Sequence, residues 1–131
     1  MQKSQEEKNL NKTIVSVVEA IQDKKGEGII DINIDKFSQT VCKHFIVCSA
    51  QSTVQVQSIA ESIEDQLITQ CHRKIYHKEG VQNGIWILLD FIDIVVHVFQ
   101  TEARQFYNLE GLWGDGILTK YPSNAEPKSK A

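Results

Sequence analysis

The sequence lacks several features that would place it in a common class at once. It has no apolar run near the roughly 18–20 residues that cross a bilayer. Its first residues, MQKSQEEKNLNK, lack the apolar segment of a secretory signal. Its formal charge is −3, whereas proteins that track phosphates along nucleic acid are usually strongly basic. We therefore expect a cytoplasmic protein that neither enters a membrane nor reads a nucleic-acid sequence.

Cysteine and glycine do not occur in the spacings that common site chemistry requires. The three cysteines, Cys42, Cys48 and Cys71, form no C-x-x-C pair, so neither a zinc site nor a disulfide framework is expected. We expect each cysteine to be a small buried hydrophobe. The chain has no glycine-rich phosphate loop and no serine or cysteine in a nucleophile motif. The sequence therefore predicts no catalytic residue, no metal and no cofactor.

The chain does have the length and composition of one globular domain. Of its 131 residues, 41% are hydrophobic and 24% are charged, values close to those of ordinary domains. We expect a single domain over residues 1–121. Residues 122–131 (PSNAEPKSKA) are polar and without periodicity, and they predict a disordered tail.

The first half of the chain alternates between helical and extended patterns. Apolar residues over 10–21 recur at helical spacing, and those over 30–34 alternate with polar ones as in a half-exposed strand. A second strand is expected over 43–48, buried on both faces. Ser52 is then the expected N-cap of an amphipathic helix, with Gln55 at the reciprocal position of a capping box.

The second half predicts a short strand near 74–78, a tight antiparallel hairpin of 86–91 and 94–99, and a last helix capped by Thr101. The resulting order, αββαβββα, predicts an α/β (α+β) fold: a mixed sheet of about five strands with flanking helices. Some apolar residues of the last helix share a face that should pack inward: Phe106, Leu109, Leu112 and Trp113.

Two acidic motifs imitate sites and are better explained by structure. Asp31, Asn33 and Asp35 match the opening of a calcium loop, but that loop needs glycine at its sixth position, where Lys36 stands. Its twelfth position needs glutamate, and Cys42 stands there. We therefore interpret these acids as the solvated face of an edge strand.

Three further polar residues lie in or beside the predicted hairpin. Asp90 and Asp93 flank its turn, where aspartates usually hydrogen-bond nearby backbone. They bring no third ligand for a metal. His97 lies between Val96 and Val98 and should point to the opposite face of the strand from them. It is either a hydrogen-bonded structural residue or a contact residue in a partner site, and the pattern leaves both roles open.

Residues 86–116 are rich in aromatic and acidic side chains. Five acids stand against one base, Arg104, and the segment includes six aromatic residues: Trp86, Phe91, Phe99, Phe106, Tyr107 and Trp113. Aromatic residues are frequent anchors of protein interfaces, and carboxylates at a rim steer the approach of a basic partner. Composition alone is also compatible with core aromatics and solvated acids.

Three ordered segments carry a more specific signal: 86–90 (WILLD), 95–99 (VVHVF) and 104–113 (RQFYNLEGLW). They resemble the signature of the ribosomal silencing factor family (RsfS, also called Iojap). That signature runs W-hydrophobic-hydrophobic-hydrophobic-D, then D-hydrophobic-V-V-H-V-F, then R-x-F-Y-x-L-E-x-L-W. Asp93 matches the aspartate before the second strand of the hairpin. The resemblance covers roughly residues 8–116.

The resemblance implies a fold related to nucleotidyltransferases, without their active site and without enzyme activity. It implies a translational repressor that binds the large ribosomal subunit through ribosomal protein L-fourteen and sterically blocks association with the small subunit. The partner-binding residues that it implies are Trp86, Leu88, Asp90, His97, Phe99, Arg104, Tyr107 and Glu110.

The chain departs from the family pattern at two loops. Ile92 stands where the family usually has glycine, and because isoleucine resists positive φ, we expect a longer or differently shaped hairpin turn. Residues 48–52 lack the glycine that is common after the second strand. Three alternatives stay open: a nucleotidyltransferase, which would need paired acids beside a Gly-Ser loop, a non-ribosomal adaptor, and a homodimer through the first helix or a sheet edge.

Overall fold

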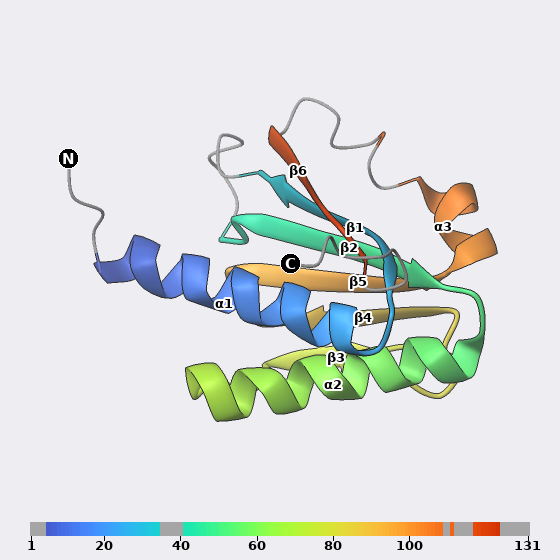
Figure 1. The fold of residues 1–131 in the computed structure, drawn as a ribbon, viewed down its shortest axis with the longest axis horizontal. Coiled ribbons are helices and arrows are strands. Elements are labelled where there is room, and N and C mark those ends of the chain that lie inside the picture. Colours follow the sequence, from blue (N-terminus) through green and yellow to red (C-terminus); the bar gives the residue numbers. More distant parts are fainter. Residues whose placement is uncertain (1–4, 35–40, 109–110, 112–116, 124–131) are drawn as a thin grey trace, which may run out of the picture.

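The computed structural model describes residues 5–34, 41–108, 111 and 117–123, which form a mixed sheet with two long helices on one face (Figure 1). The sheet has six strands in the order β3-β4-β5-β2-β1-β6. Only β2 and β5 pair in parallel among these neighbours. The elements are α1 (Gln5–Asp23), β1 (Glu27–Asn33), β2 (His44–Ala50), α2 (Thr53–Cys71), β3 (His77–Glu79), β4 (Trp86–Asp90), β5 (Ile94–Gln100), α3 (Thr101–Tyr107) and β6 (Ile117–Tyr121).

This architecture confirms the predicted α/β fold and the predicted order up to α3, but the sheet has one more strand than the pattern indicated. The sequence did not predict β6, because ILTKY shows no alternation of apolar and polar residues. Four of its five residues are exposed. It exists because β1 offers it a free edge, from Ile29 opposite Tyr121 to Asn33 opposite Ile117. Beyond β6, at the start of the predicted tail, the Gln22 amide donates a 2.7 Å hydrogen bond to the Pro122 carbonyl. Residues 124–131 lie outside the described residues.

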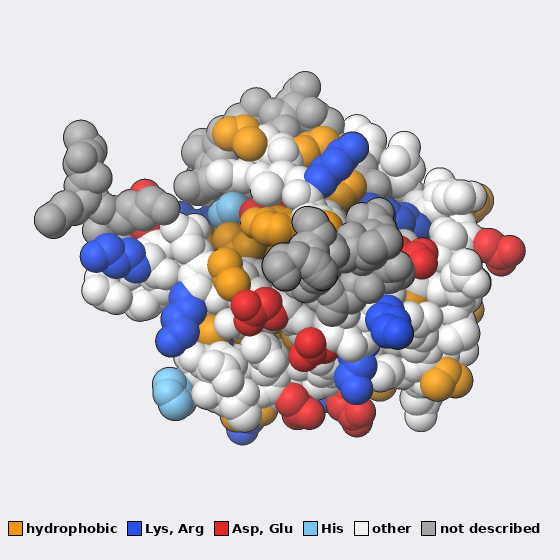
Figure 2. Space-filling model, in the orientation of Figure 1, with side chains coloured by type: hydrophobic (Ala, Val, Ile, Leu, Met, Phe, Trp, Pro, Cys, Tyr) orange, Lys and Arg blue, Asp and Glu red, His pale blue; other side chains and the backbone are white. Residues whose placement is uncertain are grey.

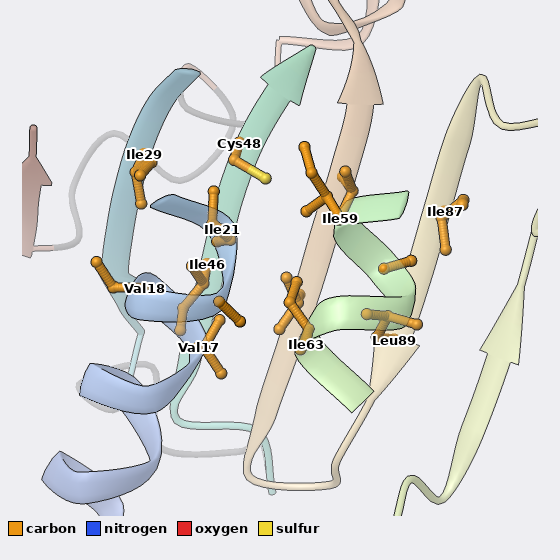
Figure 3. Packing of buried hydrophobic residues seen from close by; sticks show 14 of the residues in the cluster. Val17, Val18, Ile21, Ile29, Ile46, Cys48, Ile59, Ile63, Ile87 and Leu89 are labelled. Atoms are coloured by element: carbon orange, nitrogen blue, oxygen red, sulfur yellow. The ribbon is translucent and has the colours of Figure 1, made fainter. Parts of the chain in front are cut away.

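One face of the sheet is buried by α1 and α2. Val17, Val18 and Ile21 of α1 and Ile59 and Ile63 of α2 meet apolar side chains of the strands (Figure 3). The outward sides of these helices are charged, and acidic and basic side chains are interspersed over them (Figure 2). The burial of these apolar stripes supplies the main stabilisation of the fold.

The other face of the sheet has a smaller apolar cluster, and within the described residues no long helix covers it. Its buried members are Ile30, Ile32, Ile34, Val47 and Phe99. Partly buried side chains pack around them: Cys42, Phe45, Trp86 and Ala103. Strand β2 is therefore enclosed on both faces, as its sequence predicted.

The expected solvated edge strand at Asp31 is wrong. Because β6 pairs with the free side of β1, β1 lies inside the sheet. Asp31 is 6% exposed, and its carboxylate lies 2.6 Å from Nδ1 of His44 on the adjacent strand β2. The alternating residues of β1 therefore point to two faces that are both buried. The buried carboxylate of Asp31 is stabilised by His44, since a buried charge needs such a partner.

The start of α2 confirms Ser52 as the N-cap, but the side chain of Gln55 does not complete the predicted capping box. The Ser52 hydroxyl accepts a 3.1 Å hydrogen bond from the Gln55 backbone N–H. The Gln55 amide does not return to the cap. It donates to the carbonyls of Lys24 and Lys25, at 3.1 and 3.3 Å, and so joins the start of α2 to the end of α1.

The β4–β5 hairpin closes through a short turn that forces Ile92 to a φ of 79°. The Asp93 N–H donates to the Phe91 carbonyl at 3.1 Å, which makes Ile92 the central residue of a γ-turn of the rare, positive-φ kind. The Asp90 carboxylate accepts the Ile92 N–H at 2.7 Å. The turn thus differs in shape from the usual one, as predicted, without becoming longer.

We predict that Ile92→Gly raises the free energy of unfolding by about 1 kcal/mol. Positive φ costs a residue with a Cβ roughly 1–2 kcal/mol, and the greater freedom of glycine in the unfolded chain offsets part of this gain. Thermal unfolding should shift upward by about 4 °C. Ile92→Ala is the matched control, because it removes the exposed side chain and keeps the Cβ. A glycine variant no more stable than the alanine variant would show that the turn is unstrained.

Candidate partner-binding surface

Strands β4 and β5 turn alternate side chains toward the face that α1 and α2 leave uncovered. Ile87 and Leu89 of β4 and Val96 and Val98 of β5 belong to the core beneath the helices. Because successive strand residues point to opposite faces, the residues between them lie on the other side. There, Trp86 is paired with Phe99 and Leu88 with His97.

Rings from three strands and α3 meet on this face and form an aromatic cluster of Phe45, Trp86, His97, Phe99 and Tyr107. The Trp86 ring centroid lies 4.9 Å from that of Phe99 and 4.6 Å from that of Tyr107. Phe45 meets His97 edge-on at 5.1 Å. These separations are those of favourable aromatic pairs. The cluster is therefore a fixed, packed surface.

A hydrogen bond fixes the orientation of His97 within the cluster. The Trp86 indole Nε1–H donates to Nδ1 of His97 at 3.0 Å, so Nδ1 must be unprotonated and the ring proton resides on Nε2. That Nε2 is buried and has no hydrogen-bond partner within the described part of the chain. Burial lowers the pKa of His97 from 6.5 to about 4, so the imidazole is neutral at physiological pH.

The short helix α3 continues the cluster toward solvent. Tyr107 packs on Trp86 and is 48% exposed, and Phe106 is 81% exposed. The expectation that Phe106 packs inward is wrong, because the helix ends at Tyr107 with Asn108 in a left-handed conformation. Leu109, Leu112 and Trp113, predicted to share that face, lie outside the described residues.

The hairpin end of β4 carries the two turn aspartates. Asp90 accepts a backbone N–H of the turn, which confirms its structural interpretation. Asp93 lies 2.7 Å from the Arg73 guanidinium, which also donates to the Phe91 carbonyl. No group of three or more His, Cys, Asp or Glu side chains in the described ranges is arranged to hold a metal ion.

The structure places five of the eight predicted partner-binding residues in or next to the aromatic cluster: Trp86, Leu88, His97, Phe99 and Tyr107. His97 and Phe99 are buried beneath the others. Asp90 lies at the turn, Arg104 points toward Ser49 of β2, and Glu110 lies outside the described residues.

Sequence reasoning missed two residues of this surface. Phe45 belongs to the strand segment whose alternation was unclear, and its alignment opposite Val95 of β5 was not visible in the sequence. Phe106 was assigned to the core. A signal for its exposure was present, because Asn108 is a residue that readily ends a helix.

The three cysteines differ in how deeply they are buried. Cys48 is buried, whereas Cys42 and Cys71 are only partly so, which corrects the expectation that all three are fully buried. Burial raises the pKa of Cys42 to about 11 and that of Cys48 to about 12. No helix in the described segments is both long and apolar enough to cross a membrane.

Fold and surface define an α+β domain whose mixed sheet has one helix-covered face and one ring-bearing face. A sequence model of the family described as "Ribosomal silencing factor during starvation" matches residues 7–131. The ribosomal silencing factor RsfS of Bacillus subtilis is 39% identical over 99 residues, which are 76% of this chain and 82% of that protein.

Two solved structures share the fold. A crystal structure of a Chromobacterium violaceum protein has a TM-score of 0.75 at 32% identity and covers 92% of this chain and 95% of its own. One from Bacillus halodurans has a TM-score of 0.70 at 35% identity and covers 79% and 94%. This chain belongs to the ribosomal silencing factor family of translation regulators, as the resemblance indicated.

The lowered pKa of His97 predicts a loss of stability in acid. Between pH 6.5 and about 4 the unfolded chain binds a proton at this imidazole and the folded chain does not. The free energy of unfolding should therefore fall by about 3 kcal/mol across this window, in addition to other titrations, and this contribution should flatten below it. Chemical denaturation from pH 7.5 to 3.5 measures it.

His97→Gln is the control for that measurement, because glutamine can still accept the Trp86 N–H and does not titrate. The difference in unfolding free energy between wild type and variant should change with pH over this window. A difference that stays constant would mean that the imidazole titrates as in an unfolded chain.

Proposed function

We propose that this chain represses translation in the cytoplasm by occupying a surface of the large ribosomal subunit. It binds there through ribosomal protein L-fourteen and sterically blocks association with the small subunit. Family membership supports ribosome binding. The choice of surface rests on the aromatic cluster, whose exposed member Tyr107 is in contact with the exposed ring of Phe106.

Rings of this kind suit a docking surface for physical reasons. Tyr107 and Phe106 stand in mutual edge-on contact at 5.2 Å, and Tyr107 rests on Trp86. Aromatic side chains held in place by packing lose little conformational freedom on binding, and they are the commonest energetic anchors of interfaces. The Glu102 carboxylate, four residues before Phe106 on α3, would favour a basic partner.

Five of the eight predicted residues then divide into two roles. Tyr107, Trp86 and Leu88 are candidate contacts, with Phe106 added, while His97 and Phe99 support the rings from beneath. Asp90 would act through the hairpin turn. Glu110 stays a predicted contact outside the described residues.

Repression by occupancy requires no bond to be made or broken. The alternatives are nucleotide transfer on this fold and binding of a non-ribosomal partner. Magnesium-dependent nucleotide transfer that is abolished by Asp90→Asn would favour the first. Recovery with a non-ribosomal protein, and none with large subunits, would favour the second. A homodimer through α1 or a sheet edge stays a proposal, and its test is the mass of the free chain in solution.

We predict that the chain sediments with purified large subunits and lowers the yield of joined subunits. Phe106→Ala and Tyr107→Ala should each weaken binding by about 30-fold, the effect of losing an anchor worth about 2 kcal/mol. Sucrose-gradient sedimentation over a range of chain concentrations measures both effects.

Val15→Ala is the matched control. Val15 is 50% exposed, like Tyr107, but lies on α1, on the opposite face of the sheet. Its variant should bind as wild type does. Normal binding by both ring variants would place the interface elsewhere, and a wild-type chain left at the top of the gradient would refute ribosome binding.

A further inference from the structure

Helix α3 has little of its own to hold it in place. It is seven residues long, and none of its residues is buried. The predicted Thr101 cap is wrong, because Thr101 is already the first residue of the helix and Gln100 is the N-cap, which makes no side-chain capping bond. Isolated helices of this length are unstable in water. Yet α3 carries Phe106 and Tyr107, whose use as anchors requires a fixed position.

Besides the packing of Ala103 and Tyr107, Arg104 supplies a hydrogen-bonded attachment between α3 and the strands. Its Nη1 donates to the Ser49 hydroxyl of β2 at 3.2 Å, and more weakly to the Glu27 carbonyl of β1 at 3.5 Å. Its own carbonyl accepts the Asn108 N–H at 2.9 Å, the bond that ends the helix. One residue therefore joins the last turn of α3 to two strands.

A bulge in β1 makes room for this guanidinium. The register of β1 against β2 shifts between Glu27 and Ile30, and Gly28 in this interval has a φ of 58°. A Cβ at position 28 would lie 2.5 Å from Nη1 of Arg104. The glycine thus serves two needs at once, since it allows the positive φ of the bulge and leaves space for the arginine.

We infer that Arg104 is a positioning residue, which holds α3 against the strands so that Phe106 and Tyr107 are presented in a fixed arrangement. Its contribution to subunit binding is indirect and does not require contact with the partner. This inference rests on the proposed function for its effect on binding. The attachment itself is a property of the free chain.

An exchange of charges separates positioning from direct contact. Arg104→Glu removes the attachment, and Ser49→Lys places an ammonium against the native guanidinium, so each single variant should weaken binding by about tenfold. The double variant brings an introduced carboxylate within reach of an introduced ammonium, at about the same combined side-chain length. Its affinity should return to within about threefold of wild type.

Direct contact makes the opposite prediction for the double variant. A partner that reads the positive charge of Arg104 would still meet a carboxylate, so the double variant would bind as poorly as Arg104→Glu or worse. That result overturns the inference while wild-type binding, and with it the proposed function, stands.

A second measurement uses the free chain and a milder variant. In Arg104→Ala, hydrogen exchange at the α3 amides should accelerate by about tenfold or more, while the β4 amides keep their wild-type rates. Unchanged hydrogen exchange at the α3 amides would overturn the inference, whether or not the variant binds large subunits. If α3 exchange accelerates in Arg104→Ala but the wild-type chain does not bind large subunits, the attachment by Arg104 is supported and the proposed function is rejected.

Discussion

Strands β2 and β5 lie side by side at the centre of the sheet and run in the same direction, from His44 opposite Ile94 to Ala50 opposite Gln100. Parallel neighbours cannot be joined by a tight turn, so the chain must cross over between them. It does so through α2, β3 and β4, which puts α2 on one face and brings β5 back through the strained hairpin turn. The remaining arrangement follows from this crossover.

With α2 on one face, α1 packs beside it and the apolar side chains of the strands are buried there. In the part of the chain that the structure describes, the opposite face receives aromatic rings and not a long helix. The Trp86–His97 hydrogen bond and the stacking of Trp86 on Phe99 make these rings a rigid layer. The buried ring of Phe99 contributes to the stability of the sheet, and the half-exposed ring of Tyr107 is available to a partner.

Local signals in the sequence were sufficient wherever one segment determines its own structure. The Ser52 cap and the hairpin of β4 and β5 were correctly predicted, and so was the side of the strand toward which His97 points. Family resemblance selected most of the aromatic cluster. The cap, the hairpin and the direction of His97 depend on capping, turn chemistry and periodicity, which a single sequence displays.

Features that depend on a distant partner were not visible. Asp31 is buried against His44, and not exposed to water, because β6 pairs with the edge of β1. The sequence of β6 has no strand pattern of its own that would predict this pairing. The position of Phe45 depends on the alignment of β2 with β5. Arg104 was predicted only as a partner contact, because nothing in its own sequence neighbourhood reveals the glycine bulge that it lies against.

The central claim is that the ring-bearing face, and not the helix-covered one, meets the large subunit. Hydroxyl-radical footprinting of the chain with and without saturating large subunits tests it directly, side chain by side chain. The account predicts that oxidation of Phe106 and Tyr107 falls on binding, while that of Val15 and Ile68, on the outer sides of α1 and α2, stays unchanged. Protection of Val15 and Ile68 with both rings still fully oxidised would contradict it.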